Sequence, residues 1–105
     1  VNIDICLTVI VYSLVKVMLD DIEYIEGLDD YLKICLPGRR PLVARMTMKN
    51  MLEKLPGQKF CRVHRSFIVP LDRIEKVRNK VIFIAGREIP VGSSYEKDFF
   101  EKYSE

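Results

Sequence analysis

The stretch that decides the fold reads KFCRVHRSFIVP and covers residues 59–70. Two mainly apolar runs, 60–63 and 67–69, flank the polar trio His64-Arg65-Ser66, and His64 is the only histidine in the chain. Aromatic and β-branched residues favour strands, so we expect two strands with the trio on a loop between them. The trio has two interpretations: hydrogen-bonded polar groups at a strand end, or a recognition element for a negatively charged partner.

Composition indicates one globular domain over residues 1–105. Hydrophobic residues make up 49% of the chain and charged residues 30%, which is typical of a packed core and not of disorder. The cysteines Cys6, Cys35 and Cys61 are odd in number and form no CxxC pair. With a single histidine they predict neither a metal site nor a cofactor, and we expect buried thiols in a reduced, cytoplasmic protein.

Residues 1–13 form an unusually apolar start. The run ICLTVIVYSLV (5–15) is much shorter than the roughly 20 apolar residues that cross a bilayer, so we predict no membrane segment. A buried strand or a pair of strands is expected here, and this start is interpreted as a possible junction to a missing upstream domain.

Charge is distributed unevenly along the chain. Residues 1–36 carry two basic and seven acidic side chains, whereas residues 37–71 carry eight basic side chains and only Glu53 as an acid. A middle third of this charge is typical of a protein that binds a polyanion. The alternative is a solvated face whose charge is paired with the acidic first third.

Regular turn signals every eight to twelve residues predict an all-β architecture built from hairpins. Pro37-Gly38 is expected to turn one hairpin, and turns are also expected at 78–80 and 85–87. One short internal helix is predicted in TMKNMLEKLPG (47–57), with Thr47 as its N-cap.

A short C-terminal helix is predicted in SSYEKDFFEKYSE (93–105). Ser93 stands three residues before Glu96, which is the spacing of a capping box. Tyr95, Phe99 and Tyr103 then share one helix face, and we interpret this aromatic stripe as core packing.

Catalytic motifs are not found. A hydrolase using His64 and Ser66 would need a nucleophile on an exposed turn and an orienting carboxylate, and the sequence has no G-x-S-x-G elbow. Phosphate-binding glycine loops and the H-E-x-x-H zinc motif are also missing from the sequence. We therefore predict a protein that is not an enzyme, with no catalytic residues.

Arginine chemistry suits the alternative of a recognition element. The guanidinium of Arg65 matches two acceptors on a guanine edge or a phosphate, and His64 and Ser66 add single donors or acceptors. Other interpretations are a surface salt bridge for Arg65 and a carbonyl-bonded histidine at the core edge for His64. Sequence-independent contacts that position the domain on DNA are expected from further basic residues: Arg39, Arg40, Arg45, Lys49 and Lys59.

Six segments occur in the order and spacing of the LytTR DNA-binding domain, and the chain resembles this family over residues 14–104. The F-x-R-x-H-R-S-[FY]-[IV]-V core is the most specific of them. The segments are LDDIEYIEG (19–27), DYLKI (30–34), MTMKNMLEKLP (46–56), FCRVHRSFIV (60–69), IEKV (74–77) and IPVGSSY (89–95).

The resemblance implies a mainly β fold, an elongated arrangement of antiparallel sheets with little helix. It also implies that loops of this domain enter successive major grooves of double-stranded DNA. The implied contact segments are the loop Leu28–Lys33, the trio His64–Ser66 and the turn Gly92–Tyr95. We expect base contacts from Arg65 and His64. Phosphate contacts are expected from Ser66, Lys33, Arg39, Arg40, Arg45 and Lys49, with Ser93 and Ser94 as further candidates.

Three departures from the family pattern affect this expectation. Ser93 and Ser94 stand where members commonly have basic residues, which limits this segment to phosphate contacts at most. Pro70 stands where members often have asparagine, and LTVIVYS replaces the usual polar first hairpin. An exposed apolar hairpin at the start would suit a dimer or interdomain surface.

The predicted function is sequence-specific DNA binding in bacterial transcription, as the output domain of a two-component response regulator. The expected partners are DNA, an upstream receiver or sensor domain, and a second copy as a homodimer on DNA. The alternative is an interaction or dimerisation module of the same fold with weak or no DNA binding.

Overall fold

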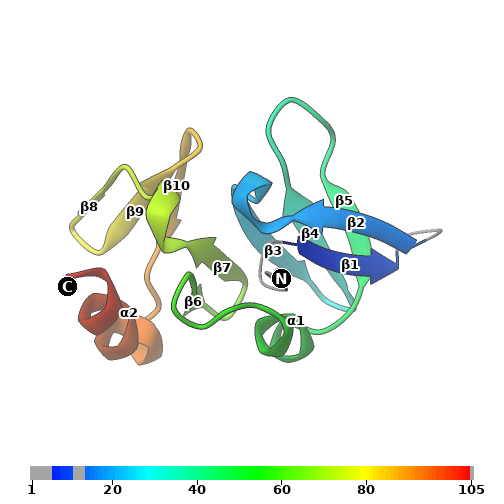
Figure 1. Ribbon diagram of the computed structural model, residues 1–105. Helices are drawn as coiled ribbons and strands as arrows, with labels where there is room; N and C mark the ends of the chain where they lie inside the picture. The colour runs from blue at the N-terminus through cyan, green and yellow to red at the C-terminus, as the bar shows by residue number, and fades with distance from the viewer. Residues whose placement is uncertain (1–5, 11–13, 105) are drawn as a thin grey trace.

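The computed structural model describes residues 6–10 and 14–104, with side chains described from Leu14 onward. These residues form a two-stranded, a three-stranded and a five-stranded sheet, two α-helices and three short 3-10 turns (Figure 1). The predicted mainly β, antiparallel fold with two helices is confirmed. The elements are β1 (Cys6–Ile10), β2 (Leu14–Met18), η2 (Leu19–Asp21), β3 (Tyr24–Leu28), β4 (Tyr31–Cys35), β5 (Leu42–Arg45), α1 (Met48–Lys54), β6 (Phe60–His64), β7 (Phe67–Pro70), η3 (Leu71–Arg73), β8 (Lys76–Arg78), β9 (Val81–Ile84), β10 (Arg87–Pro90), η4 (Ser93–Tyr95) and α2 (Glu96–Tyr103).

The five-stranded sheet, in the order β5-β4-β3-β7-β6, separates two hydrophobic clusters. Successive side chains of a strand point to opposite faces, so neighbouring residues enter different clusters. On β7, Ile68 packs in the first cluster, while Phe67 and Val69 pack in the second. The two nearly continuous apolar runs in 60–69 therefore belong to a strand pair that is covered on both faces.

Each face of this sheet is covered by different elements. The first cluster joins the sheet to β2 and α1 through residues such as Val17 and Met51. The second joins it to β9, β10 and α2 through residues such as Ile82, Ile89 and Phe99. Figure 1 shows the β1–β2 hairpin and the β8–β10 sheet on opposite sides of the central strands.

Hairpin turns lie where the sequence predicts them. Gly38 has φ +70° in the β4–β5 connection, where the lack of a Cβ makes this backbone accessible. Asn79 and Lys80 both have positive φ between β8 and β9, and Ala85 and Gly86 do so between β9 and β10. Positive φ at both central residues is typical of type I′ turns, whose twist matches the flanking strands.

One helix start is confirmed and the other is wrong. The Thr47 side chain accepts a hydrogen bond from the Asn50 backbone N–H at 3.0 Å, as predicted for the N-cap of α1. No capping box forms at Ser93, because residues 93–95 make the 3-10 turn η4 and α2 begins at Glu96 without a side-chain cap. Sequence spacing alone does not distinguish a cap from a preceding 3-10 turn.

The aromatic stripe of α2 packs as predicted at two of its three positions. Phe99 is fully buried, and its ring stacks on Tyr103 with centroids 5.4 Å apart. Tyr95 lies before the helix and pairs instead with the guanidinium of Arg62, 5.6 Å from its ring centroid.

The predicted strand pair at the start is confirmed as the antiparallel hairpin β1–β2, with Cys6 opposite Met18 and Ile10 opposite Leu14. Val17 is buried, whereas Leu14 and Met18 are 71% and 41% exposed. The rest of the apolar start, residues 1–5 and 11–13, lies outside the described residues, as do the side chains of β1, including Cys6. Among the helices described, none is long and apolar enough to cross a membrane.

Cys35 and Cys61 are buried free thiols, as predicted for these two cysteines. Burial raises the pKa of the Cys61 thiol to about 11, and Asp98, with Oδ2 3.7 Å from Sγ, acts in the same direction. In the part of the chain described, no three histidine, cysteine or acidic side chains are grouped as a metal site requires.

The raised pKa of Cys61 predicts a loss of stability at alkaline pH. The unfolded thiol ionises near its ordinary pKa, whereas the folded thiol keeps its proton up to about pH 11. The free energy of unfolding should therefore fall as pH rises from about 9 to about 11. Urea unfolding of the wild type and Cys61→Ala checks this, and the wild type should lose more stability over that interval. Equal losses in both proteins would contradict it.

Candidate nucleic-acid interface

The polar trio lies where β6 passes into β7. His64 ends β6, and Arg65 and Ser66 turn the chain into Phe67. The strand register shifts between Arg62 and His64, because Arg62 is opposite Ile68 while His64 is opposite Phe67. Such a bulge increases the local twist and redirects the side chains beside it. The predicted loop between two strands is therefore confirmed, and we call residues His64, Arg65 and Ser66 the β6–β7 turn.

Two other segments hold the β6–β7 turn through backbone hydrogen bonds. The Gly27 N–H donates to the Ser66 carbonyl at 2.8 Å, and the Gly92 N–H donates to the Val63 carbonyl at 2.8 Å. Gly27 stands two residues before the Asp29-Asp30 turn, and Gly92 directly precedes η4. The three segments that the resemblance implies are thus brought together at one end of the central sheet.

His64 is half-buried and tied to its own turn. Its Nδ1 accepts a hydrogen bond from the Ser66 backbone N–H at 3.1 Å, and its ring lies 5.7 Å from that of Phe67. With Nδ1 acting as an acceptor, the neutral ring carries its proton on Nε2. The bonded partner is a backbone N–H and not the carbonyl of the alternative interpretation.

Arg65 is exposed and takes part in no ion pair among the described residues. It borders an open depression of about 370 Å³. The predicted residues Lys49 and Ser66 line the same depression, so the fold brings three of the candidates together. The other lining residues are Gly27, Asp29, Thr47, Met48 and Arg62.

Arg62 also contributes to this site, although in the sequence it stands out only as one of the basic residues of 37–71. Its Nη2 donates to the Arg65 carbonyl at 2.6 Å, and its Nε donates to the His64 carbonyl at 3.4 Å. The available signal was its position two residues before His64 in the strand pattern. Side chains two residues apart on a strand lie on the same face of the sheet. The bulge and the hydrogen bonds of Arg62, however, cannot be predicted from this spacing.

Lys33 does not lie on a loop as the resemblance implies. Only Asp29 and Asp30 form the turn between β3 and β4, with φ +51° at Asp29, and Lys33 lies within β4. Its Nζ is 3.9 Å from Glu26 Oε1, and Glu26 also pairs with Arg87 at 3.2 Å. Since Glu26 offsets part of its charge, Lys33 is a weaker candidate for a phosphate contact than Lys49.

Arg45 and the pair Arg39-Arg40 lie at opposite ends of β5. Arg45 is opposite Tyr31 beside the Asp29-Asp30 turn, and its guanidinium lies 5.9 Å from the Tyr31 ring centroid. Arg39 and Arg40 lie in the connection beyond the far end of β4. A five-residue strand such as β4 spans about 15 Å, so Arg39 and Arg40 at one end are not grouped with Arg65 at the other.

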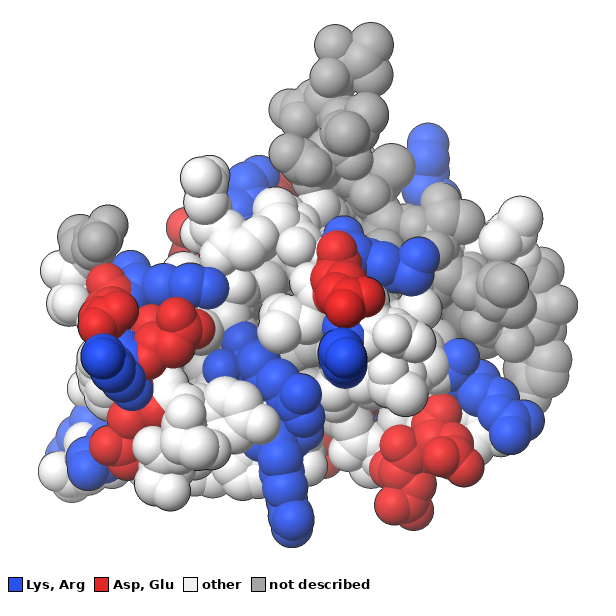
Figure 2. Space-filling model, turned by 90° about the horizontal axis from the view of Figure 1, so that it is seen from below, with Lys and Arg blue, Asp and Glu red and all other residues white. Residues whose placement is uncertain are grey.

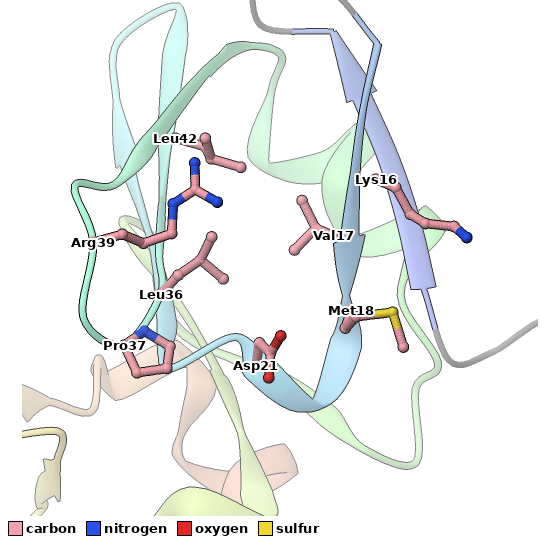
Figure 3. Close-up of a pocket in the computed structure, with 8 residues that line it drawn as sticks. All are labelled: Lys16, Val17, Met18, Asp21, Leu36, Pro37, Arg39 and Leu42. Carbon is pink, nitrogen blue, oxygen red and sulfur yellow. The ribbon is translucent and has the colours of Figure 1, made fainter.

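Arg39 instead borders a pocket of about 340 Å³ at that far end. Its guanidinium and the carboxylate of Asp21 both point toward the space between β2 and the β4–β5 connection, over an apolar lining (Figure 3). The lining residues are Lys16, Val17, Met18, Asp21, Leu36, Pro37, Arg39 and Leu42.

Ser93 and Ser94 are exposed on η4, directly after Gly92. Gly92 touches the β6–β7 turn, because a Cβ added there would be 3.7 Å from the Cα of His64. Both serines are therefore placed beside the β6–β7 turn, as the resemblance implies for this segment.

Basic and acidic side chains are mixed on one face of the molecule. Figure 2 shows the face that carries α1 and α2 in the lower part of Figure 1, and its basic side chains alternate with acidic ones. The basic middle third of the sequence therefore does not fold into a single uniform patch. Its residues divide between the end with the β6–β7 turn and the end with Arg39 and Arg40.

Comparison with known proteins gives one consistent family. Residues 12–104 match the LytTr DNA-binding domain. A Bacillus anthracis protein named Sensory transduction protein LytT is 33% identical over 82% of this chain and 37% of its own length. A protein of the same name from Enterococcus faecalis is 36% identical over 53% of this chain and 26% of its own length. The matched part of the chain thus spans 37% of the length of one relative and 26% of the other. The solved structure of a LytTr DNA-binding domain from Bacillus cereus superposes with a TM-score of 0.75, at 21% identity, over 92% of this chain and 94% of that one.

Proposed function

Because the chain belongs to the LytTr DNA-binding domain family, which is not a family of enzymes, we propose that it binds double-stranded DNA in a sequence-specific way. The observation that carries the proposal is the β6–β7 turn. It presents an exposed arginine and a tautomer-fixed histidine from a backbone that is hydrogen-bonded on two sides. Rigid donors at fixed positions are what base recognition requires.

The residues have distinct proposed roles. Arg65 donates to two acceptors on a base edge in the major groove, and His64 adds a donor from Nε2. Lys49, Ser66 and Arg45 contact phosphates beside this turn, and Ser93 and Ser94 do so from η4. The three segments enter successive major grooves from one face. Arg39 and Arg40 lie at the other end of the sheet, so we assign them no contact beside this turn, and we expect Lys33, which pairs with Glu26, to contribute less than Lys49.

The wider setting is proposed from the relatives. Proteins named Sensory transduction protein LytT contain a matching segment in about a third of their length. We infer that the domain is the output part of a two-component response regulator, controlled by an upstream receiver or sensor domain. We also infer that two copies occupy paired DNA sites.

A selection of bound duplexes from a random pool tests the proposal. We expect one recurrent motif, and we expect the affinity for it to fall with salt by a logarithmic slope of about −0.9 for each phosphate contacted. An interaction module without DNA binding is the other candidate, favoured by the exposed Leu14 and Met18 on β2. That candidate predicts no enriched motif and self-association instead.

Lys49→Ala should weaken binding to every duplex about equally. Lys49 lies beside Arg65 in the depression, and removing one phosphate contact should reduce the salt slope by about 0.9. Arg39→Ala is the matched control, because it removes the same charge at the far end of the sheet. Binding titrations over a range of salt concentrations check both variants. An equal effect of the two would show that only net charge matters.

A further inference from the structure

Arg62 connects the β6–β7 turn to the segment before α2. On one side, its guanidinium donates to the carbonyls of His64 and Arg65, at 3.4 and 2.6 Å. On the other side, the same group lies over the ring of Tyr95, 5.6 Å from the centroid. One half-buried side chain therefore touches two of the three segments assigned to DNA binding.

The contact between these segments is close. Gly92 donates to the Val63 carbonyl at 2.8 Å, and a Cβ at Gly92 would be 3.1 Å from the Tyr95 ring. Tyr95, Gly92 and His64 therefore pack together. Arg62 joins them through its hydrogen bond to the His64 carbonyl and its contact with the Tyr95 ring. A shift of the turn would have to break these contacts together.

An arginine can bond the carbonyls of His64 and Arg65 and lie over the Tyr95 ring with one planar group, which a lysine ammonium cannot reproduce. A guanidinium is a planar fork that donates in two directions at once and stacks on an aromatic ring. A lysine at this position would keep the charge but present a single ammonium on a flexible stem. The geometry thus uses the shape of the arginine and not only its charge.

We propose that Arg62 is a positioning residue for DNA recognition: it fixes the backbone of the β6–β7 turn and couples that turn to Gly92–Tyr95. Arg65 and His64 then present their donors in one orientation, while Arg62 itself reads no base. The link to recognition rests on the proposed function, whereas the hold on the turn is a property of the free domain.

Amide relaxation of the free domain tests the hold on the turn. Arg62→Lys should move the amide signals of Arg65, Ser66 and Tyr95 and lower the order parameters of the turn from the rigid range. Arg45→Lys is the matched control, since Arg45 lies at the same end without bonding to this turn. Unchanged order parameters in Arg62→Lys overturn the proposal, whether or not the domain selects a DNA sequence.

Binding measurements test the effect on recognition. Arg62→Lys should lose about tenfold of the preference for the selected duplex over a random one, with the random-duplex affinity and the salt slope unchanged. A merely structural loss of folded protein would reduce both affinities alike. If Arg62 instead contacted phosphate, lysine would restore binding and only Arg62→Gln would reduce the salt slope. A retained preference in Arg62→Lys, beside a lost one in Arg65→Ala, overturns this inference and leaves the proposed function standing.

Discussion

Replacing Arg65 by alanine is expected to cost about 1–3 kcal/mol of the free energy by which the domain prefers its selected duplex over a random one. Arg65 is exposed at the tip of the β6–β7 turn, beside Lys49 and Ser66, and no ion pair among the described residues occupies it. Losing a two-point contact to a base edge removes discrimination, whereas losing one positive charge weakens all duplexes alike. Competition binding against both duplexes separates these effects.

Two variants control for charge. Arg40→Ala removes the same charge from the β4–β5 connection at the far end of the sheet and should leave the preference unchanged. Arg65→Lys keeps the charge but loses the donor fork, so it should keep the random-duplex affinity and lose most of the preference. If Arg65→Ala retained the wild-type preference, the role assigned to Arg65 would be wrong.

The largest effect on stability is expected from Phe99→Ala, which should reduce the free energy of unfolding by about 3–5 kcal/mol. Phe99 is fully buried in the second hydrophobic cluster, with Tyr103 stacked on it and the Phe100 ring edge-on at 5.0 Å. Small domains are stable by only about 5–15 kcal/mol, so the change removes a large share of the total. Urea unfolding should show a lower midpoint with an unchanged slope.

Phe100→Ala is the matched control for this prediction. Phe100 is only partly buried at the edge of the same cluster, so its truncation should cost clearly less than that of Phe99. Equal losses for the two variants would mean that α2 does not anchor the second cluster through Phe99.

The sequence predicted the parts of the fold that depend on local patterns. Two apolar runs in 60–69 indicated strands, and Ile68 and Val69 pack into opposite clusters because both sheet faces are covered. Thr47 before an apolar helix pattern indicated an N-cap, which forms. Ser93 matched a capping box equally well, yet η4 occupies its place. Two local conformations compete there, and spacing does not decide between them.

The site was less predictable, because it depends on which ends of the strands meet. Strand register puts Arg45 beside Tyr31 and places Arg39 at the other end, although both arginines belong to one basic stretch of sequence. Lys33 is a weaker candidate for a phosphate contact for a related reason, since its partner Glu26 comes from the neighbouring strand. The contacts of Arg62 depend on a bulge that no sequence pattern predicts.

The central claim is that the end of the sheet carrying the β6–β7 turn faces DNA. Amide signals of the domain, followed while the selected duplex is added, test this claim most directly. We predict that the largest changes fall on His64–Ser66, the Asp29-Asp30 turn and Gly92–Tyr95, with little change at Arg39 and Arg40. Changes concentrated on β2 and the β4–β5 connection, with the β6–β7 turn unaffected, would contradict the account.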